Sequence, residues 1–486
     1  MALLAALSML PFLGITDFYT KGEPREAIVA VSMLTDNNWI LPTNNGGDIA
    51  YKPPLLHWCI ALLFKTLGTC NEYLSRLPSA LSFIGLIVGT FFFFARFAGV
   101  HRALLTALLT MTAFEVHRAG NNCRVDMMLT VFIVSATYLL YIWHHDGRRQ
   151  VPWLAILCMS LGTLTKGPVA IILPCLAVGV FMLTNGATLK RMALVPLWAV
   201  MSMGLPLIWY VAAYKQGGSE FLRLVIEENF DRFTGQMSYS SHVKPVYYNV
   251  LTLLAGWLPW TPMVLVVLWQ WRKQRLSWAD LRKLFGRQTG IRRFALTAFL
   301  SIFLFYCIPE SKRSTYLLPC YPFMAYLLAD FILWFIRQTD GMWLRRNLRK
   351  AVAGVMLLFA LVDGVIFPLA IRNRSDESLA QYIAQTYKRQ PVYSYLSDTM
   401  LNFYGTDFYL HDRIADFRDV NPRCGILMMA EQDVASFRKN YGNKYNLQLV
   451  GRTTRPRTEL HDYIRFYKFC SKNKKKSLKI SKALHC

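Results

Sequence analysis

The chain has 486 residues, of which 54% are hydrophobic and only 17% are charged. Soluble domains usually carry about a quarter charged residues, so this composition excludes an ordinary soluble protein and indicates a chain embedded in a bilayer. The net charge of +25 would suggest nucleic-acid binding in a soluble protein. Here the lysines and arginines lie largely in short loops between apolar segments, which is typical of cytoplasmic loops, and we expect no nucleic-acid partner.

Apolar segments recur along the first 371 residues, and a bilayer span needs roughly 20 such residues. They lie near 2–16, 77–95, 102–119, 124–143, 152–165, 168–184, 192–213, 249–271, 294–309, 315–336 and 351–371. The segment 2–16 has no basic residues before its apolar run, so we expect a first membrane helix rather than a cleaved signal peptide. A further stretch, 54–68, is short and carries His57 and Lys65.

The basic loops decide whether 54–68 crosses the bilayer. They lie at 96–102, 144–149, 189–191, 271–293 and 337–350. All of them fall on one side only if 54–68 lies at the interface, and lysine and arginine favour the cytoplasmic side. We therefore predict about eleven spans over 1–371, with an interfacial helix at 54–68. The outer side then receives loops 17–76, 120–126, 214–248 and 309–316.

After residue 371 the pattern changes to short apolar strands with polar segments between them. Strands are predicted at 391–396, 425–430, 446–453 and 463–469, with a helix within 431–442. The fold class is thus an α-helical polytopic membrane protein with a small α/β domain at 372–470, which this topology places outside the membrane. The basic tail 471–486 is predicted to be disordered.

Ionisable residues near membrane segments are functional candidates because burying a charge there is costly. In the first outer loop, Pro24 favours a helix start, and the helix is predicted to run to about Leu34. Glu23 is then either a catalytic carboxylate or a residue that stabilises the helix start, and Arg25 points from the same turn. Lys52 precedes two prolines that hold it extended; it is placed either to bind a phosphate or to reach for the interface.

Other outer loops contribute further polar candidates. Asp126 opens a predicted membrane helix beside Arg124, so it is either a buried base or orienting group, or a helix-start residue paired with that arginine. Loop 214–248 carries His242 and Lys244.

The small outer turn 309–314 carries Lys312 and Arg313 against the charge trend, with Tyr316 at the head of the next span, and Lys166 lies at another outer turn. Cations and carboxylates from separate loops thus face one compartment. That pattern suits an anionic leaving group together with a general base.

Several motifs occur in a fixed order over about residues 15–335. They are REA-x-x-A-x-x-ML (25–34), YKPPL (51–55), RLPSAL (76–81), RVDMML (124–129), LTKGP (164–168), ENFDRF (228–233), HVKP (242–245), GWLPWTP (256–262) and SKRSTYLLP (311–319). In this set the chain resembles the C-type membrane glycosyltransferases. The likeness is closest to the lipid A aminoarabinose transferases and more distant to the protein O-mannosyltransferases.

The resemblance implies a sugar donor of the undecaprenyl-phosphate type and an acceptor reached from the periplasmic face. It also implies that Lys52 and Tyr316 contact the lipid phosphate, and that the carboxylates of the first loop and of the VD motif serve the acceptor. The chain departs from the relatives at two positions. Gly22 stands where they carry an aspartate before Glu23, and Tyr51 stands where they often carry a glutamate that pairs with a later histidine at a metal.

These departures favour Glu23 as the base and leave His242 without that metal partner, so a divalent cofactor has little support. The predicted function is inverting transfer of a sugar from a polyprenyl phosphate to lipid A, another glycan or a protein, at the outer face of the bacterial inner membrane. Glu23 or Asp126 is the catalytic carboxylate.

The predicted substrate-binding side chains are Arg25, Lys52, His242, Lys244, Lys312 and Tyr316. The alternatives are a transporter or flippase of lipid-linked sugars, which would favour broken helices and repeats, and a membrane assembly factor, which would need no converging cations. No internal repeat is evident.

Overall fold

The structure is a computed structural model of all 486 residues. It describes residues 1–18, 20, 22–231, 234, 243–263, 265, 269, 272, 289–338, 342–371, 376–396, 403–453 and 463–472. The chain divides into a first unit, 1–15 with 51–368, and a second unit, 16–50 with 369–486. Residues 16–50, most of the predicted outer loop 17–76, therefore group with the C-terminal domain, whereas the rest of that loop belongs to the first unit.

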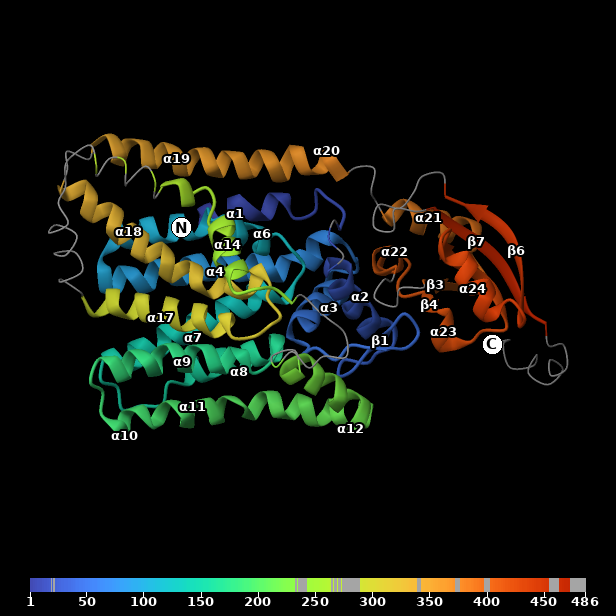
Figure 1. The fold of residues 1–486 in the computed structure, drawn as a ribbon, viewed down its shortest axis with the longest axis horizontal. Coiled ribbons are helices and arrows are strands. Elements are labelled where there is room, and N and C mark those ends of the chain that lie inside the picture. Colours follow the sequence, from blue (N-terminus) through green and yellow to red (C-terminus); the bar gives the residue numbers. More distant parts are fainter. Residues whose placement is uncertain are drawn as a thin grey trace. The chain divides into compact units, whose positions relative to one another are not determined.

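The first unit is a bundle of helices (Figure 1). Its α-helices are α1 (Ala2–Met9), α3 (Leu55–Leu67), α4 (Glu72–Ala98), α5 (Val100–Met111), α6 (Phe114–Gly120), α7 (Val125–His145), α8 (Trp153–Lys166), α9 (Val169–Thr184), α10 (Leu189–Met192), α11 (Leu194–Ser202), α12 (Gly204–Ile226), α14 (Tyr247–Gly256), α17 (Gly290–Cys307), α18 (Tyr321–Gln338), α19 (Met342–Leu361) and, in the second unit by its last residues, α20 (Phe367–Ile371). Short 3-10 or π-helical turns are η1 (Leu10–Phe12), η2 (Glu227–Asp231), η3 (Ser314–Cys320) and η4 (Val362–Ile366).

Among the described residues, six helical segments are long and apolar enough to cross a membrane. They are Glu72–Ala98, Val125–His145, Leu189–Asp231, Gly290–Cys307, Ser314–Arg337 and Arg346–Ile371. Five more apolar helices are shorter, among them α3 with 13 residues. At 1.5 Å per residue α3 is about 20 Å long, whereas the hydrocarbon core is about 30 Å thick. That length agrees with an interfacial helix, and the topology and the number of spans stay predictions.

Local signals explain where these helices begin and end. Asn71 caps α4, because its side chain accepts a hydrogen bond from the Leu74 backbone N–H at 2.9 Å. Gly68 ends α3 in the left-handed conformation, with φ of 69°, and its N–H bonds to the Phe64 carbonyl. These two caps fix the short turn between α3 and α4.

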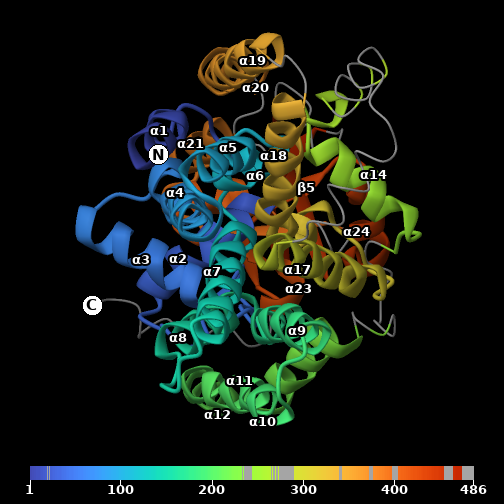
Figure 2. The same ribbon diagram turned by 90° about the vertical axis from the view of Figure 1, so that its left-hand side faces the viewer.

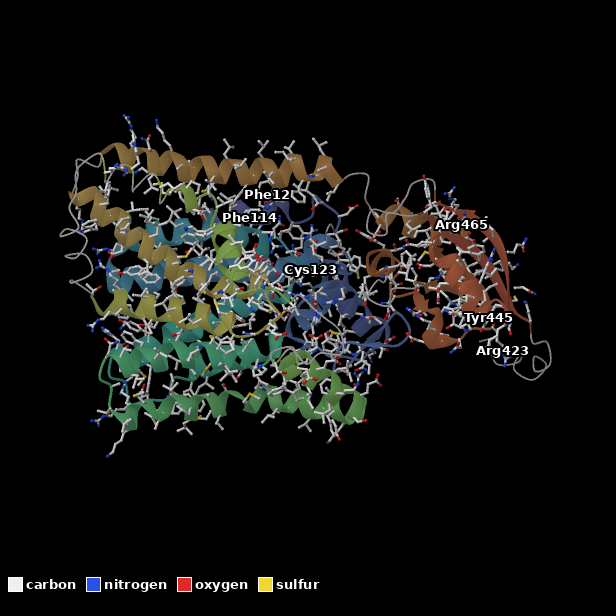
Figure 3. All side chains as sticks on the ribbon, in the orientation of Figure 1. Phe12, Phe114, Cys123, Arg423, Tyr445 and Arg465 are labelled. Atoms are coloured by element: carbon white, nitrogen blue, oxygen red, sulfur yellow. The ribbon has the colours of Figure 1, made fainter. Side chains whose placement is uncertain are left out.

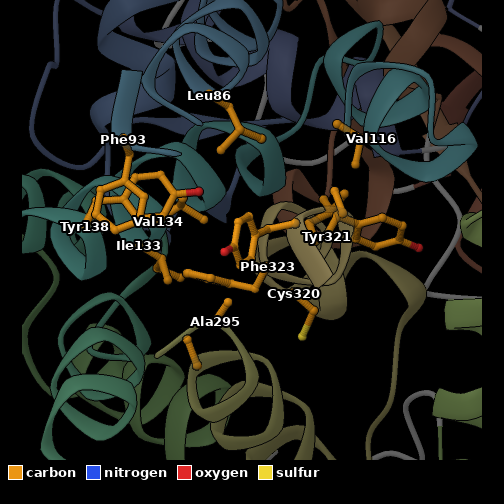
Figure 4. Close-up of a cluster of buried hydrophobic side chains, with 14 of the residues drawn as sticks. Leu86, Phe93, Val116, Ile133, Val134, Tyr138, Ala295, Cys320, Tyr321 and Phe323 are labelled. Atoms are coloured by element: carbon orange, nitrogen blue, oxygen red, sulfur yellow. The ribbon is translucent and has the colours of Figure 1, made fainter. Parts of the chain in front are cut away.

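Helix α7 is the core of the first unit and packs against α4, α8 and α9 (Figure 2). Its Tyr138 ring stacks on Phe93 of α4 with centroids 3.9 Å apart, and Phe323 of α18 meets the same ring edge-on (Figure 4). Aromatic pairs of this kind contribute about 0.5–1.5 kcal/mol beyond the area they bury. The packing fixes the start of α7, which carries Asp126.

The second unit contains a five-stranded sheet in the order β4-β3-β5-β7-β6. Its strands are β3 (Val392–Tyr395), β4 (Ile414–Asp416), β5 (Cys424–Ala430), β6 (Tyr445–Arg452) and β7 (Ile464–Ser471), with β3, β4 and β5 parallel and β7 antiparallel to β5 and β6. The helices are α2 (Gly22–Thr35), α21 (Asp376–Thr386), α22 (Tyr404–Tyr409), α23 (Phe417–Val420) and α24 (Asp433–Tyr441). A small hairpin joins β1 (Thr43–Asn44) to β2 (Asp48–Ile49).

The middle of this sheet is covered on both faces. Ile426 and Met428 of β5 pack into one apolar cluster with Ile383 of α21, while Leu427 and Met429 pack into another with Phe437 of α24. A strand buried on both faces reads as a continuous apolar run rather than an alternating one. This explains the uninterrupted GILMMA stretch, and the four predicted strands and the predicted helix are confirmed.

Candidate active site

Asp126 lies in the first turn of α7 and forms the most buried ion pair of the predicted site residues. Its side chain is 4% exposed, and its Oδ1 is 2.5 Å from Nζ of Lys166. Its Oδ2 lies 3.4 Å from Nε of Arg124. A helix N-terminus also favours negative charge. Both carboxylate oxygens therefore face cations, and Asp126 orients Lys166.

Lys166 also lies over the ring of Tyr316, in η3. Its Nζ is 4.7 Å from the ring centroid, within the range of a cation–π contact. The Tyr316 ring in turn stacks on Tyr306, with centroids 5.3 Å apart. The structure thus brings the predicted residues Asp126 and Tyr316 together through Lys166, which the sequence placed at an outer turn but not among the site residues.

Gly167 fixes the turn that presents Lys166. It has φ of +111°, and an added Cβ would lie 2.7 Å from Oδ1 of Asn229. A side chain at this position would therefore be both strained and obstructed. Glycine lets the LTKGP turn approach the ENFDRF motif, so two motifs of the predicted set meet here.

Two other segments that the sequence predicts on the outer side also meet. Val243 and Ser311 form an isolated β-bridge, and the backbone N–H of Lys244 donates to the Glu310 carbonyl at 3.2 Å. Lys312 is 5% exposed, and its ammonium donates to the carbonyl of Pro309 in its own turn. Lys312 therefore braces this turn, while the Lys244 side chain is exposed.

The predicted residues of the first loop lie in both units. Lys52, half-buried, belongs to the first unit and precedes α3. Glu23 and Arg25 belong to α2 in the second unit, and this helix begins at Gly22 close to the predicted start. Glu23 is fully buried, as is Glu26 at 2% exposure, and Nη2 of Arg25 lies 3.7 Å from Oε1 of Glu26.

Glu26 was not among the predicted residues, although its spacing of three from Glu23 places both carboxylates on one face of the helix. The structure therefore adds a second buried carboxylate to the loop that carries the candidate base.

The C-terminal domain holds this loop through Asp412. Its Oδ2 accepts a hydrogen bond from the Ser32 hydroxyl of α2 at 2.7 Å, and its Oδ1 accepts one from the Asn45 backbone N–H at 3.1 Å. The Asn45 carbonyl accepts from the Asp416 N–H at 2.8 Å, and the Phe18 and Phe408 rings meet edge-on. All of these contacts lie within the second unit.

A second carboxyl, Asp407, lies beside Asp412. Burial, and then the neighbouring Asp412 charge, raise the pKa of Asp407 well above its usual range. Burial also raises the pKa of Asp412, against the hydrogen bonds from Ser32 and Asn45. One proton shared by the two carboxyls is the arrangement that these contacts favour.

Among the residues that the structure describes, no group of three or more His, Cys, Asp or Glu side chains is arranged to hold a metal ion. His242 lies outside the described residues. The site that the structure does describe is instead an ammonium held between a carboxylate and a tyrosine ring. Such a group is suited to binding an oxyanion.

Comparison with known proteins matches this architecture. A profile of the dolichyl-phosphate-mannose-protein mannosyltransferase family matches residues 51–212. The chain is 29% identical over 339 residues to an undecaprenyl phosphate-alpha-4-amino-4-deoxy-L-arabinose arabinosyl transferase of Shewanella sediminis, covering 67% of this chain and 58% of the relative. An uncharacterized protein of Aquifex aeolicus is 28% identical over 326 residues, covering 66% of this chain and 60% of the relative.

Solved structures match the fold. The crystal structure of ArnT from Cupriavidus metallidurans bound to undecaprenyl phosphate superposes with a TM-score of 0.70 at 18% identity, covering 96% of each chain. The Archaeoglobus fulgidus oligosaccharyltransferase gives a TM-score of 0.50 at 12% identity, over 85% of this chain and 64% of that one.

The helical bundle with a small C-terminal sheet has the fold of the solved ArnT structure. Six of its described helical segments are long and apolar enough to cross a membrane, and the predicted fold class is confirmed. Within that class the chain resembles the aminoarabinose transferases, as the order of its motifs predicted. It spans about three fifths of the length of the relatives named above.

Proposed function

We propose that this protein is a glycosyltransferase that moves a sugar from a polyprenyl phosphate to an acceptor at the outer face of the inner membrane. The observation that carries the proposal is the contact of Lys166 with both Asp126 and Tyr316. A cation fixed in this way is preorganised for the phosphate that departs when the glycosidic bond breaks. The relatives that act on undecaprenyl-phosphate sugars, and the mannosyltransferase family match, support the same donor class.

The proposed reaction is a single displacement with inversion. The acceptor hydroxyl loses its proton to a carboxylate, its oxygen attacks the anomeric carbon, and the bond from that carbon to the phosphate oxygen breaks. The polyprenyl phosphate leaves with the electron pair of that bond. Charge grows on the phosphate toward the transition state, so cations that bind it there raise the rate and not only the affinity.

We propose different roles for the two candidate carboxylates. Asp126 faces Lys166 and Arg124 with its two oxygens, which suits an orienting group better than a base. Glu23 is therefore the proposed base, on the loop that leads into Lys52. Lys52, Lys166 and Tyr316 are proposed to hold the lipid phosphate, and Arg25, His242, Lys244 and Lys312 remain proposed contacts to donor or acceptor.

The test is turnover in proteoliposomes that contain the purified protein and a polyprenyl-phosphate aminopentose. Lipid A is the first acceptor to offer, followed by another glycan and by protein. Transfer with release of polyprenyl phosphate supports the proposal. Movement of the intact donor across the bilayer without transfer would instead identify a transporter. If neither transfer nor movement occurred, the assembly-factor alternative would remain.

A further inference from the structure

The two central strands of the C-terminal sheet place two cysteines directly opposite each other. In the antiparallel pair β5–β7, Cys424 is the partner of Cys470. The backbone N–H of Ser471 donates to the Arg423 carbonyl at 2.7 Å, so the bonded residues are the next pair along the ladder. Cys424 and Cys470 therefore form a non-hydrogen-bonded pair, the kind in which side chains are closest.

The geometry of such a pair matches that of a disulfide. Non-hydrogen-bonded partners have Cα atoms about 4.5 Å apart and Cβ atoms about 4.5–5.5 Å apart or less. Disulfides join residues whose Cα atoms are about 4.4–6.8 Å apart and whose Cβ atoms are about 3.5–4.5 Å apart. A small closure of the two side chains suffices to bring the sulfur atoms into bonding range.

Both thiols are accessible, and the electrostatics at Cys470 agree with the strand register. Hydrogen bonding with the Cys424 thiol is the largest cause that raises the pKa of Cys470. Both cysteines are exposed. Lys468 lies two residues before Cys470, on the same face of β7, and its charge favours the thiolate at Cys470.

The pair lies at the end of the sheet where β5 begins and β7 ends. Figure 3 shows Arg423 and Tyr445, which flank the pair, at that end of the domain and Arg465 at the opposite end. A bond here joins the parallel strands β4, β3 and β5 covalently to the antiparallel strands β7 and β6. The bond would therefore reinforce the β5–β7 pairing, through which the parallel and antiparallel parts of the sheet are joined.

We propose that Cys424 and Cys470 form a cross-strand disulfide in the cell, supplied by a dithiol–disulfide oxidoreductase of an oxidising compartment. The thiolate of Cys470 attacks the disulfide of the oxidant, and a mixed disulfide forms as one thiol of the oxidant leaves. The thiolate of Cys424 then displaces the second. The protein loses two electrons and two protons, and the oxidant gains them as two thiols.

The proposal also reports on topology, because disulfides persist in the periplasm and are rare in the cytosol. It does not depend on the glycosyltransferase activity. A disulfide between Cys424 and Cys470 is the modification expected of a C-terminal domain on the outer side.

The test uses the full chain with the other eight of its ten cysteines replaced by serine. Growing cells are quenched in acid, free thiols are blocked with N-ethylmaleimide in denaturant, and the protein is then reduced and labelled with a maleimide-polyethylene glycol. We expect two labels per chain after reduction and none without it. Blocking of both thiols before reduction, leaving no label, would overturn the proposal.

A matched control chain carries Cys424→Ser and keeps Cys470 as its one cysteine, so that the strand partner is missing. Its thiol should be blocked in the same cells. Purified protein incubated with oxidised glutathione provides the second measurement. The Cys424–Cys470 chain should lose both thiols without gaining glutathione, whereas Cys424→Ser should gain one glutathione at Cys470. Two glutathiones on the paired chain would show that the strands cannot close, and would also overturn the proposal.

Discussion

The ion pair of Asp126 and Lys166 can be separated into a structural and a functional part by a double-mutant cycle. The Asp126 side chain is 4% exposed and that of Lys166 is 27% exposed, with 2.5 Å between Oδ1 and Nζ. Replacing Lys166 by Met keeps the length of the side chain and removes its charge. The buried carboxylate then keeps only the contact with Arg124 at 3.4 Å.

The magnitudes follow from burial. Breaking a buried ion pair by removing one partner costs about 3–5 kcal/mol, and the remaining Arg124 contact places Lys166→Met at the lower end, about 3 kcal/mol. Asp126→Asn leaves the Lys166 ammonium, which can reach solvent, so we expect the free energy of unfolding to fall by only about 1–2 kcal/mol. The double variant contains neither of the two charges, so neither is left buried without its partner. A coupling of about 2 kcal/mol should therefore leave the double variant about 2–3 kcal/mol less stable than the natural protein, rather than the roughly 4–5 kcal/mol to which the two single losses would add.

Turnover should behave differently from stability. If Lys166 binds the departing phosphate, its loss lowers the rate on the order of a hundredfold, as removal of one oxyanion donor does. The double variant should unfold in detergent at a higher temperature than the sum of the two single losses predicts, but it should be no more active than Lys166→Met. Lys190→Met, at an exposed lysine of α10, is the control and should change neither. A double variant with near-normal transfer would refute the phosphate role and leave Lys166 as a counter-ion of Asp126.

Three further predictions concern Lys52, Gly167 and Asp407. Lys52→Ala should lower turnover on the order of a hundredfold and Lys52→Arg should restore it partly; normal transfer by the alanine variant would remove Lys52 from the site. Gly167→Ala should lower the free energy of unfolding by about 1–3 kcal/mol, because of its positive φ and the clash with Asn229. The control is Gly179→Ala in α9, where an added Cβ meets nothing within 4 Å. Thermal unfolding should show that this control is neutral or stabilising. The raised pKa of Asp407 makes its contribution to stability fully present below the ordinary carboxyl pKa of about 4 and lost as the pH rises through its folded value. Hydrogen exchange of α22 should thus accelerate with pH beyond the intrinsic rate. Asp407→Asn, which cannot ionise, should flatten that trend, and an unchanged trend would refute the role of Asp407.

Local patterns made the fold predictable. The strands at 392–395, 424–430, 445–452 and 464–471, and the start of α2 at Gly22, follow from apolar runs and helix-start chemistry. Strand β4 was missed because its three residues, Ile414–Asp416, are too few to show a period. Pairing with β3 along one side defines this edge strand, not its own sequence.

The site was predictable only in part. Asp126 and Tyr316 could be proposed from their motifs, but the cation between them comes from α8, 40 residues beyond Asp126. The contact between Ser32 and Asp412 joins residues 380 apart, and nothing in the sequence around Asp412 distinguishes it from other surface aspartates. Packing alone decides which charges share a pocket, so a single sequence gives the candidates and not their pairing.

The docking of the first loop on the C-terminal domain gives that domain a role in the proposed reaction. The domain's Asp412 and Asp416 fix Ser32 and the hairpin tip at Asn45, and strand β2 ends three residues before Lys52. A flexible loop would lose conformational entropy each time it ordered Glu23 for a reaction, at about 1–2 kcal/mol per residue. Anchoring the loop in advance removes that cost from every turnover. With Glu23 as the proposed base, the same anchoring would let the C-terminal domain contribute to the proposed reaction by preorganisation, even though none of its own side chains need touch the donor.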